Sequence, residues 1–189
     1  RAAPDGPAHP PQTLAPRTPP GPACADLRDG RSIGLMSDVN PRTERPALAL
    51  TIAGSEATGG AGAQADLKTF QELGVFGIVS LTCIVSFDPK DGWNHRFFPV
   101  PTEVIADQLE AVQKDYEGTL KTVKLGMQGS PEVIKTTAAA LKSQEWDHVL
   151  LDPVLICKGQ EAGHALDTDQ ALKAELLPLA TFTLSLIHI

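Results

Sequence analysis

Residues 47–74, ALALTIAGSEATGGAGAQADLKTFQELG, decide the fold because they combine a strand, a glycine-rich bend and a helix. Residues 48–53 form a continuous apolar run, which is typical of a strand buried on both faces of a sheet. Residues 62–73 place apolar side chains at positions 63, 67, 70 and 73, a helical spacing that stops at Gly74. A glycine-rich bend between a strand and a helix indicates a bound ligand, whose chemistry must be sought in the surrounding residues.

The rest of the chain repeats this alternation of strands and helices. The patterns predict strands at 77–87, 122–125, 148–151 and 180–183, and helices at 102–116, 131–143 and 171–179. We expect Thr102 and Ser130 to cap the first two helices, and residues 95–100 to form a short strand that leaves the main sheet. The alternation indicates an α/β fold with a mostly parallel sheet, in which ligands gather at the carboxyl ends of the strands.

Composition restricts the class of function. A length of 189 residues with 42% hydrophobic content suits one domain with a packed core. The net charge of −7 argues against a nucleic-acid partner, and no apolar run is long enough to predict a membrane span. The three cysteines are widely spaced, which favours reduced thiols in a cytoplasmic protein over a disulfide framework or a metal cluster. These features together favour a small molecule as the partner.

The two ends of the chain differ from the middle in composition. Residues 1–46 are rich in proline and poor in large apolar side chains, so we expect a disordered segment. We interpret residues 1–35 as upstream sequence before a natural start at Met36, with a proline-rich docking segment as the alternative. Residues 184–189, LSLIHI, match one translated frame of a common sequencing adapter, and we interpret them as a non-native tail. Residues 47–183 then contain the folded domain.

The glycine-rich bend allows two interpretations. Residues 60–65 match the dinucleotide fingerprint G-x-G-x-x-G/A, but a spacer at 55–59 separates them from the strand, and no acidic residue follows at the expected distance. A P-loop is excluded because the sequence contains no Gly-Lys-Ser/Thr. A substrate loop fits better, because glycines let the backbone approach a ligand closely. Glu56 could then pair with a ring nitrogen or a hydroxyl, or be a solvated loop carboxylate.

Charged and reactive residues occur around this bend and near the end of the chain. Asp152 ends a predicted strand, where its carboxylate could hold a Mg²⁺–phosphate complex or simply form an Asp-Pro turn. Residues 156–164 are expected to form a lid loop, in which Lys158 could meet a phosphate. Cys157, in the same loop, could react with an aldehyde or be an inert thiol. Asp66 and Lys68 are expected to be surface charges with a weak ion pair.

Three ordered motifs resemble one protein family. The motifs are TIAGSEATGGAGAQADLKTFQELGV at 51–75, KLGMQGSPEVI at 124–134 and LLDPVLICKG at 150–159. They are similar to the ribokinase-like hydroxymethylpyrimidine/phosphomethylpyrimidine kinases and to the bacterial vitamin B6 kinases derived from them. The resemblance covers residues 47–183 and implies a three-layer ribokinase-like fold around a central, mostly parallel sheet. It further implies ATP and Mg²⁺ as cofactors and a cytoplasmic homodimer that phosphorylates a hydroxymethyl group on a heteroaromatic ring.

The resemblance also implies roles for individual residues. The substrate contacts would come from Glu56, Gly60, Phe87, Met127 and Cys157, with Cys157 assisting from a lid. The ATP and Mg²⁺ contacts would come from Asp152, which reaches the metal indirectly, and from Lys158. Phe87 stands where the pyrimidine kinases have a hydrogen-bonding glutamine, so a pyridine such as pyridoxal is favoured as substrate. Glu56 stands where family members often have aspartate, so its carboxylate is carried on a side chain that is one methylene longer.

The family's catalytic loop, GTGD or GTGC, does not occur in this sequence. The resemblance therefore implies a fold that is incomplete at its C-terminus and a fragment without kinase activity of its own. For the parent enzyme it implies ATP-dependent phosphorylation of pyridoxal, pyridoxine or pyridoxamine to the 5′-phosphate. A hydroxymethylpyrimidine kinase of thiamin biosynthesis is the alternative enzyme, and a B6-binding module is the alternative without catalysis.

Overall fold

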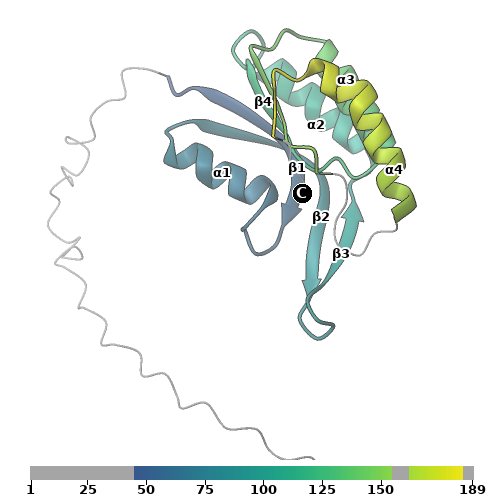
Figure 1. The fold of residues 1–189 in the computed structure, drawn as a ribbon. Coiled ribbons are helices and arrows are strands. Elements are labelled where there is room, and N and C mark those ends of the chain that lie inside the picture. Colours follow the sequence, from purple (N-terminus) through teal and green to yellow (C-terminus); the bar gives the residue numbers. More distant parts are fainter. Residues whose placement is uncertain (1–44, 155–161, 185–189) are drawn as a thin grey trace, which may run out of the picture. The chain divides into compact units, whose positions relative to one another are not determined.

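A six-stranded sheet organises the described part of the chain, residues 45–154 and 162–184, in this computed structural model (Figure 1). Its strand order is β3-β2-β1-β4-β5-β6. The strands are β1 (Leu48–Glu56), β2 (Phe76–Asp88), β3 (Asn94–Pro99), β4 (Thr122–Leu125), β5 (His148–Leu151) and β6 (Phe182–Thr183). Neighbouring strands are parallel except for β2 and β3. The prediction of an α/β fold with a mostly parallel sheet is confirmed.

Helices cover both faces of this sheet and give the molecule three layers. One face carries α1 (Gly62–Glu72), and the other carries α2 (Thr102–Asp115), α3 (Pro131–Lys142) and α4 (Ala162–Ala171) (Figure 1). The side chains of β1 alternate accordingly, since Thr51 bonds to α1 while Leu50 and Ile52 pack with α2 and α3. Within the described ranges, no helix has both the length and the apolar character needed to cross a membrane.

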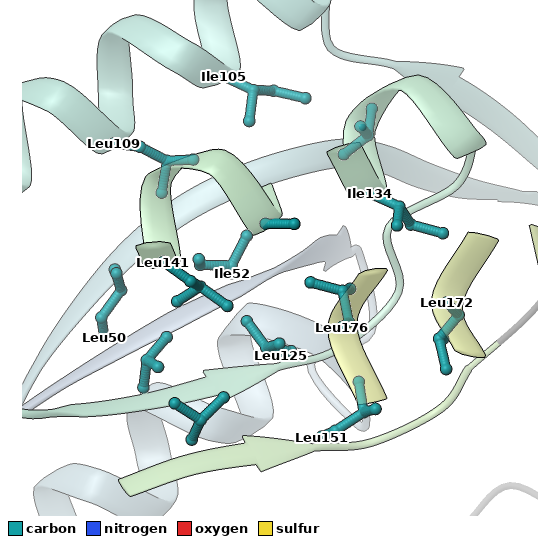
Figure 2. Packing of buried hydrophobic residues seen from close by; sticks show 14 of the residues in the cluster. Leu50, Ile52, Ile105, Leu109, Leu125, Ile134, Leu141, Leu151, Leu172 and Leu176 are labelled. Carbon is teal, nitrogen blue, oxygen red and sulfur yellow. The ribbon is translucent and has the colours of Figure 1, made fainter. Parts of the chain in front are cut away.

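The apolar core lies between the sheet and the helices on its α2–α3 face (Figure 2). Strand and helix side chains that are at most 4% exposed meet there, among them Leu50, Ile52, Leu125, Leu151, Ile105, Leu109, Ile134 and Leu141. Burying one such side chain contributes about 1.5–3 kcal/mol to stability. This face is therefore the main source of the stability of the fold.

β3 stays in the main sheet, so the prediction that it leaves the sheet is wrong. β2 is 13 residues long, and its second half, from Cys83 to Asp88, pairs antiparallel with β3. Nearer the start of β2, a side chain takes the place of a neighbouring strand. Gln108 of α2 accepts a hydrogen bond from the Leu81 amide at 2.9 Å and donates one to the Leu81 carbonyl at 3.2 Å. β2 is therefore long enough to pair with β3 through its second half and with Gln108 through Leu81.

The two predicted helix caps have different outcomes. The hydroxyl of Ser130 caps α3 by accepting a hydrogen bond from the Val133 amide at 3.3 Å, as predicted. Thr102 is not an N-cap, because it is the first residue of α2 and no side chain caps that helix. Pro101 precedes it with a φ of −54°. The fixed φ of proline orients the chain into the first turn without help from a hydroxyl.

The helical segment before β6 is longer than predicted. α4 begins at Ala162, inside the predicted lid loop, and is followed by a π-helical turn (Leu172–Leu176) and a 3-10 turn (Leu177–Leu179). The predicted start at residue 171 is wrong because Gly163 and the small and polar residues around it hide any helical spacing of apolar side chains. The remainder of the predicted lid, residues 156–161, lies outside the described residues.

Candidate active site

A cavity of about 290 Å³ opens at the carboxyl ends of β1, β2, β4 and β5. This volume lies near the lower end of the range for ligand pockets, which begins at about 300 Å³, and it suits a ligand with a single ring. The residues around it fall into two sets that differ in character. The charged lining includes Glu56, Lys124 and Asp152, and the apolar lining includes Val85, Phe87 and Met127, with the imidazole of His95 beside Phe87.

Glu56 organises the glycine-rich loop through its carboxylate. That carboxylate accepts hydrogen bonds from the hydroxyl and the amide of Thr58, at 2.7 and 2.8 Å, and from the amides of Gly60 and Ala61, at 2.9 and 3.3 Å. Burial raises the pKa of Glu56, but the hydrogen bonds from Thr58, Gly60 and Ala61 together outweigh it, so the pKa lies below the ordinary value. The carboxylate therefore shapes the loop, and the predicted contact with a substrate stays a prediction.

The same hydrogen bonds argue against a dinucleotide site. In that fold, the pyrophosphate accepts hydrogen bonds from the amides at the start of the helix that follows the first strand. Here the amides of Gly60 and Ala61, just before α1, are already bonded to the carboxylate of Glu56. A second negative group at this position would meet the charge of Glu56. The geometry therefore favours a substrate loop over a dinucleotide fingerprint.

Two glycines let α1 begin directly against the end of β1. Gly62 has a φ of +61°, and a Cβ added there would lie 2.3 Å from the carbonyl oxygen of Gly54. A Cβ on Gly54 would in turn lie 2.6 Å from the Sγ of Cys83 on β2. Only glycine permits approaches this close without rearrangement. The glycines thus serve the packing of α1, β1 and β2 at the rim of the cavity.

Lys124 joins two carboxylates beside the cavity. Its Nζ lies 3.0 and 3.1 Å from the two carboxylate oxygens of Asp66 on α1, and 3.6 Å from Oδ2 of Asp152. Thr51 of β1 also donates a hydrogen bond to Asp66, at 2.6 Å. The expectation that Asp66 is a surface charge is wrong, because its side chain is only 16% exposed. Lys68 instead donates to the carbonyl of Gly59, at 3.0 Å.

Lys124 is a site residue that the sequence analysis missed. The signal was a lysine within TVKL, a short strand in which both neighbours of the lysine, Val123 and Leu125, are apolar. A cation in a central parallel strand is unusual, because such strands are covered on both faces. That position alone was a reason to look for an acidic partner. The partner could not be read from the local pattern, because Asp66 lies 58 residues earlier.

Phe87 and His95 form an aromatic pair in the wall of the cavity. They are cross-strand partners on β2 and β3, and their rings meet edge to face with centroids 4.7 Å apart at 88°. Met127 packs beside Phe87 in a small cluster around Cys83 and Val85. Phe87 was predicted as a site residue, whereas His95 was missed. The antiparallel register across the turn between β2 and β3 could have identified His95 as its partner.

The structure brings four of the seven predicted site residues together. Glu56, Phe87, Met127 and Asp152 all line the cavity. Gly60 lies in the adjoining loop and is not among the described residues that line the cavity. Cys157 and Lys158 lie outside the described residues. The functional roles of all seven stay predictions.

Asp152 suits an indirect magnesium site. It follows the end of β5, its amide bonds to the Leu125 carbonyl at 2.9 Å, and its side chain is 32% exposed. Across residues 45–154 and 162–184, no group of three or more His, Cys, Asp or Glu residues could hold a metal alone. Mg²⁺ commonly keeps several waters and binds one or two carboxylates together with substrate phosphates. The carboxylate of Asp152 therefore fits magnesium that arrives with a nucleotide, whereas the carboxylate of Glu56 is bonded to its own loop.

Comparison with known proteins identifies the family. The model of the phosphomethylpyrimidine kinase family matches residues 56–184, which is more than half of the chain. The chain belongs to this family. It is 45% identical to the pyridoxine kinase of Bacillus subtilis over 133 residues, covering 70% of this chain and 48% of that protein. It is 41% identical to the hydroxymethylpyrimidine/phosphomethylpyrimidine kinase of Haemophilus influenzae over 131 residues, covering 69% of this chain and 47% of that protein.

A solved structure supports the same family assignment. The pyridoxal kinase from Staphylococcus aureus, in complex with AMP-PCP and pyridoxal, superposes with a TM-score of 0.65 at 38% sequence identity. The match covers 74% of this chain and 48% of that protein. The chain thus spans about half the length of the relatives it matches. The likeness confirms the predicted three-layer ribokinase-like architecture for the residues it covers.

Proposed function

We propose that the complete protein is an ATP-dependent kinase of vitamin B6, which phosphorylates the hydroxymethyl group of pyridoxal, pyridoxine or pyridoxamine. The observation that carries this proposal is the placement of Phe87 in the same cavity as Asp152. An apolar ring there suits a heteroaromatic substrate, and a carboxylate suits Mg²⁺–ATP. The similarity to a pyridoxine kinase and to a pyridoxal kinase supports it. From the family resemblance we also propose that it acts as a cytoplasmic homodimer.

The apolar lining favours a pyridine over an aminopyrimidine. The ring of Phe87 offers neither a donor nor an acceptor, and Met127 beside it adds a polarisable but weakly bonding surface. An aminopyrimidine would leave its amino group and ring nitrogens without partners against such a surface, which lowers its affinity. A pyridine ring has fewer polar groups that need partners, so it can pack on the same surface with a smaller loss of affinity. This contrast is why vitamin B6 is proposed ahead of hydroxymethylpyrimidine.

The proposed chemistry is a transfer that depends on position and charge. Mg²⁺–ATP bound beside Asp152 would supply the phosphoryl group and part of the neutralising charge. The loop held by Glu56 forms the rim of the cavity next to the start of α1. It can hold the substrate ring while the apolar lining fixes the plane of that ring. Cys157 and Lys158 are proposed to contact the aldehyde end of the substrate and a phosphate, as the family resemblance implies.

Steady-state kinetics of the complete protein test the proposed substrate. We expect kcat/KM to be at least about tenfold higher for pyridoxal than for hydroxymethylpyrimidine, the size of discrimination that a few unpaired polar groups produce. F87Q should reduce this preference, because the amide can bond to the pyrimidine. F98Q is the matched control, since Phe98 is 55% exposed and does not line the cavity.

Two outcomes would replace the proposal. A higher kcat/KM for hydroxymethylpyrimidine in the unaltered protein would assign it to thiamin biosynthesis. Tight binding of pyridoxal without any turnover, in the presence of ATP and Mg²⁺, would assign it to the B6-binding alternative.

A further inference from the structure

We propose that Asp66 is a positioning residue that draws Lys124 toward α1, weakens the ion pair between Lys124 and Asp152, and so keeps more of the charge of Asp152 available for the magnesium–nucleotide complex. This inference rests on the proposed function. Asp66 itself does not line the cavity, whereas Lys124 and Asp152 both do. Asp66 would therefore act through Lys124 and not by touching a ligand.

The geometry shows an unequal sharing of one cation between two carboxylates. Lys124 makes two hydrogen bonds to Asp66, at 3.0 and 3.1 Å, whereas its distance to Asp152 is 3.6 Å. Hydrogen bonds from N–H groups to oxygen are normally 2.7–3.2 Å long, so Lys124 is hydrogen-bonded to Asp66 and forms a looser ion pair with Asp152. The three side chains come from α1, β4 and the end of β5. The lysine is thus hydrogen-bonded to the carboxylate that does not line the cavity.

Two features of the structure favour Asp66 as the partner. Thr51 donates a 2.6 Å hydrogen bond to the same carboxylate and fixes its orientation from β1. The Asp66 side chain is also less exposed than that of Asp152, at 16% against 32%. Charge pairs are stronger where less water screens them. Both features make the Asp66–Lys124 pair the tighter of the two contacts.

The consequence concerns the charge that faces the cavity. Lys124 is hydrogen-bonded to Asp66, so its longer ion pair with Asp152 offsets only part of the negative charge of Asp152 at the cavity. If Asp66 lost its charge, Asp152 would be the carboxylate nearest to Lys124. The lysine would then move toward Asp152 and compete with Mg²⁺ for it. Asp66 would in this way set how strongly the site attracts the metal.

The test is the D66N variant of the complete protein. Asparagine keeps the shape of the side chain and an oxygen that can accept the hydrogen bond from Thr51. We expect the affinity for Mn²⁺ in the presence of ADP, measured by electron paramagnetic resonance, to fall by about tenfold, which corresponds to about 1.4 kcal/mol of competition from Lys124. The Mg²⁺ concentration that gives half-maximal turnover should rise by a similar factor. KM for pyridoxal should change little.

A second variant separates this role from a merely structural one. In the double variant D66N/K124M the competing cation is gone, so the Mn²⁺ affinity should recover toward the unaltered value. D169N is the matched control, because Asp169 pairs with Lys173 at 2.7 Å on the surface of α4 and its neighbouring turn. It should leave the Mn²⁺ affinity unchanged.

The inference and the proposed function fail in different ways. An unchanged Mn²⁺ affinity in D66N, or a double variant that binds Mn²⁺ as weakly as D66N, would overturn the role of Asp66. A lower melting temperature in D66N with normal metal affinity would overturn it as well. Unaltered protein that binds Mn²⁺ and ADP but does not phosphorylate pyridoxal would contradict the proposed function instead.

Discussion

The two faces of the sheet are joined to their helices by different kinds of contact. On the α2–α3 face, Leu50, Ile52 and Leu125 are at most 1% exposed within the apolar core. On the α1 face, Thr51 and Lys124 come from the same two strands and reach the carboxylate of Asp66. Alternate residues of a strand point to opposite faces, so one short segment serves both. The residues that stabilise the core and the residues that place charge therefore lie on opposite faces of β1 and β4.

The largest expected effect comes from breaking the apolar face. L125A should lower the free energy of unfolding by about 2–5 kcal/mol, because it removes a fully buried side chain and leaves a cavity. L73A is the control, since Leu73 is 73% exposed and its truncation should change little. Urea denaturation of the complete protein measures both. Equal losses in the two variants would contradict the assignment of stability to the α2–α3 face.

A smaller effect is expected where α1 meets β1. In G62A, the new side chain stands on a backbone with a φ of +61°, and its Cβ would lie only 2.3 Å from the Gly54 carbonyl oxygen. The strained backbone alone costs about 1–3 kcal/mol, so the free energy of unfolding should fall by at least that amount. G92A is the control, because Gly92 has a similar φ of +57° but a Cβ there would meet nothing within 4 Å, so this variant measures the cost of the backbone strain without a steric clash. Thermal unfolding compares the two. If G62A were no worse than G92A, the close approach of α1 to β1 would not matter.

The smallest expected effect sharpens the role of Glu56 at the edge of the α1 face. Its folded pKa lies below the usual 4.5, so the stabilisation from its hydrogen bonds is present above the unfolded pKa and is lost as pH falls through the folded pKa. E56Q should therefore be less stable than the unaltered protein near pH 7, and the difference should vanish in acid. The group is solvent-screened, so the effect should be well below that of L125A.

Urea midpoints measured from neutral pH to pH 3 follow this difference. T58A removes the hydroxyl donor to Glu56 and should give an intermediate pH dependence. A constant gap between E56Q and the unaltered protein at all pH values would show that the carboxylate charge does not organise the loop.

Much of the fold could be predicted because its signals are local. β1 and α1 follow directly from an apolar run, a glycine bend and a helical spacing within one segment. The cap of α3 was visible as Ser130 followed by Pro131. Asp152 was found because it follows a predicted strand, where α/β folds bind ligands, and Phe87, at the end of another predicted strand, was found through the family resemblance. Position along a strand and the family resemblance together therefore identified a charged and an apolar residue of one cavity.

Some features escaped prediction because they depend on contacts between distant segments. Others escaped because a neighbouring proline or glycine changed the meaning of the local sequence pattern. Asp66 was taken for a surface charge because its helix alone does not show that Lys124 lies opposite. Thr102 has the chemistry of a cap, but Pro101 before it makes a cap unnecessary. The start of α4 was missed because Gly163 suggests a loop, and packing of the following Leu172 and Leu176 into the core stabilises the segment instead. Tertiary context decided each of these cases.

Gln108 has a consequence for how this sheet behaves in a crowded solution. A strand edge with a free amide and carbonyl can recruit a strand from another molecule and begin an intermolecular sheet. By bonding to both groups of Leu81, the carboxamide of Gln108 imitates one residue of a neighbouring strand and leaves nothing there to recruit. A single side chain on α2 thus removes one site of strand recruitment, at Leu81, just before the residues of β2 that pair with β3.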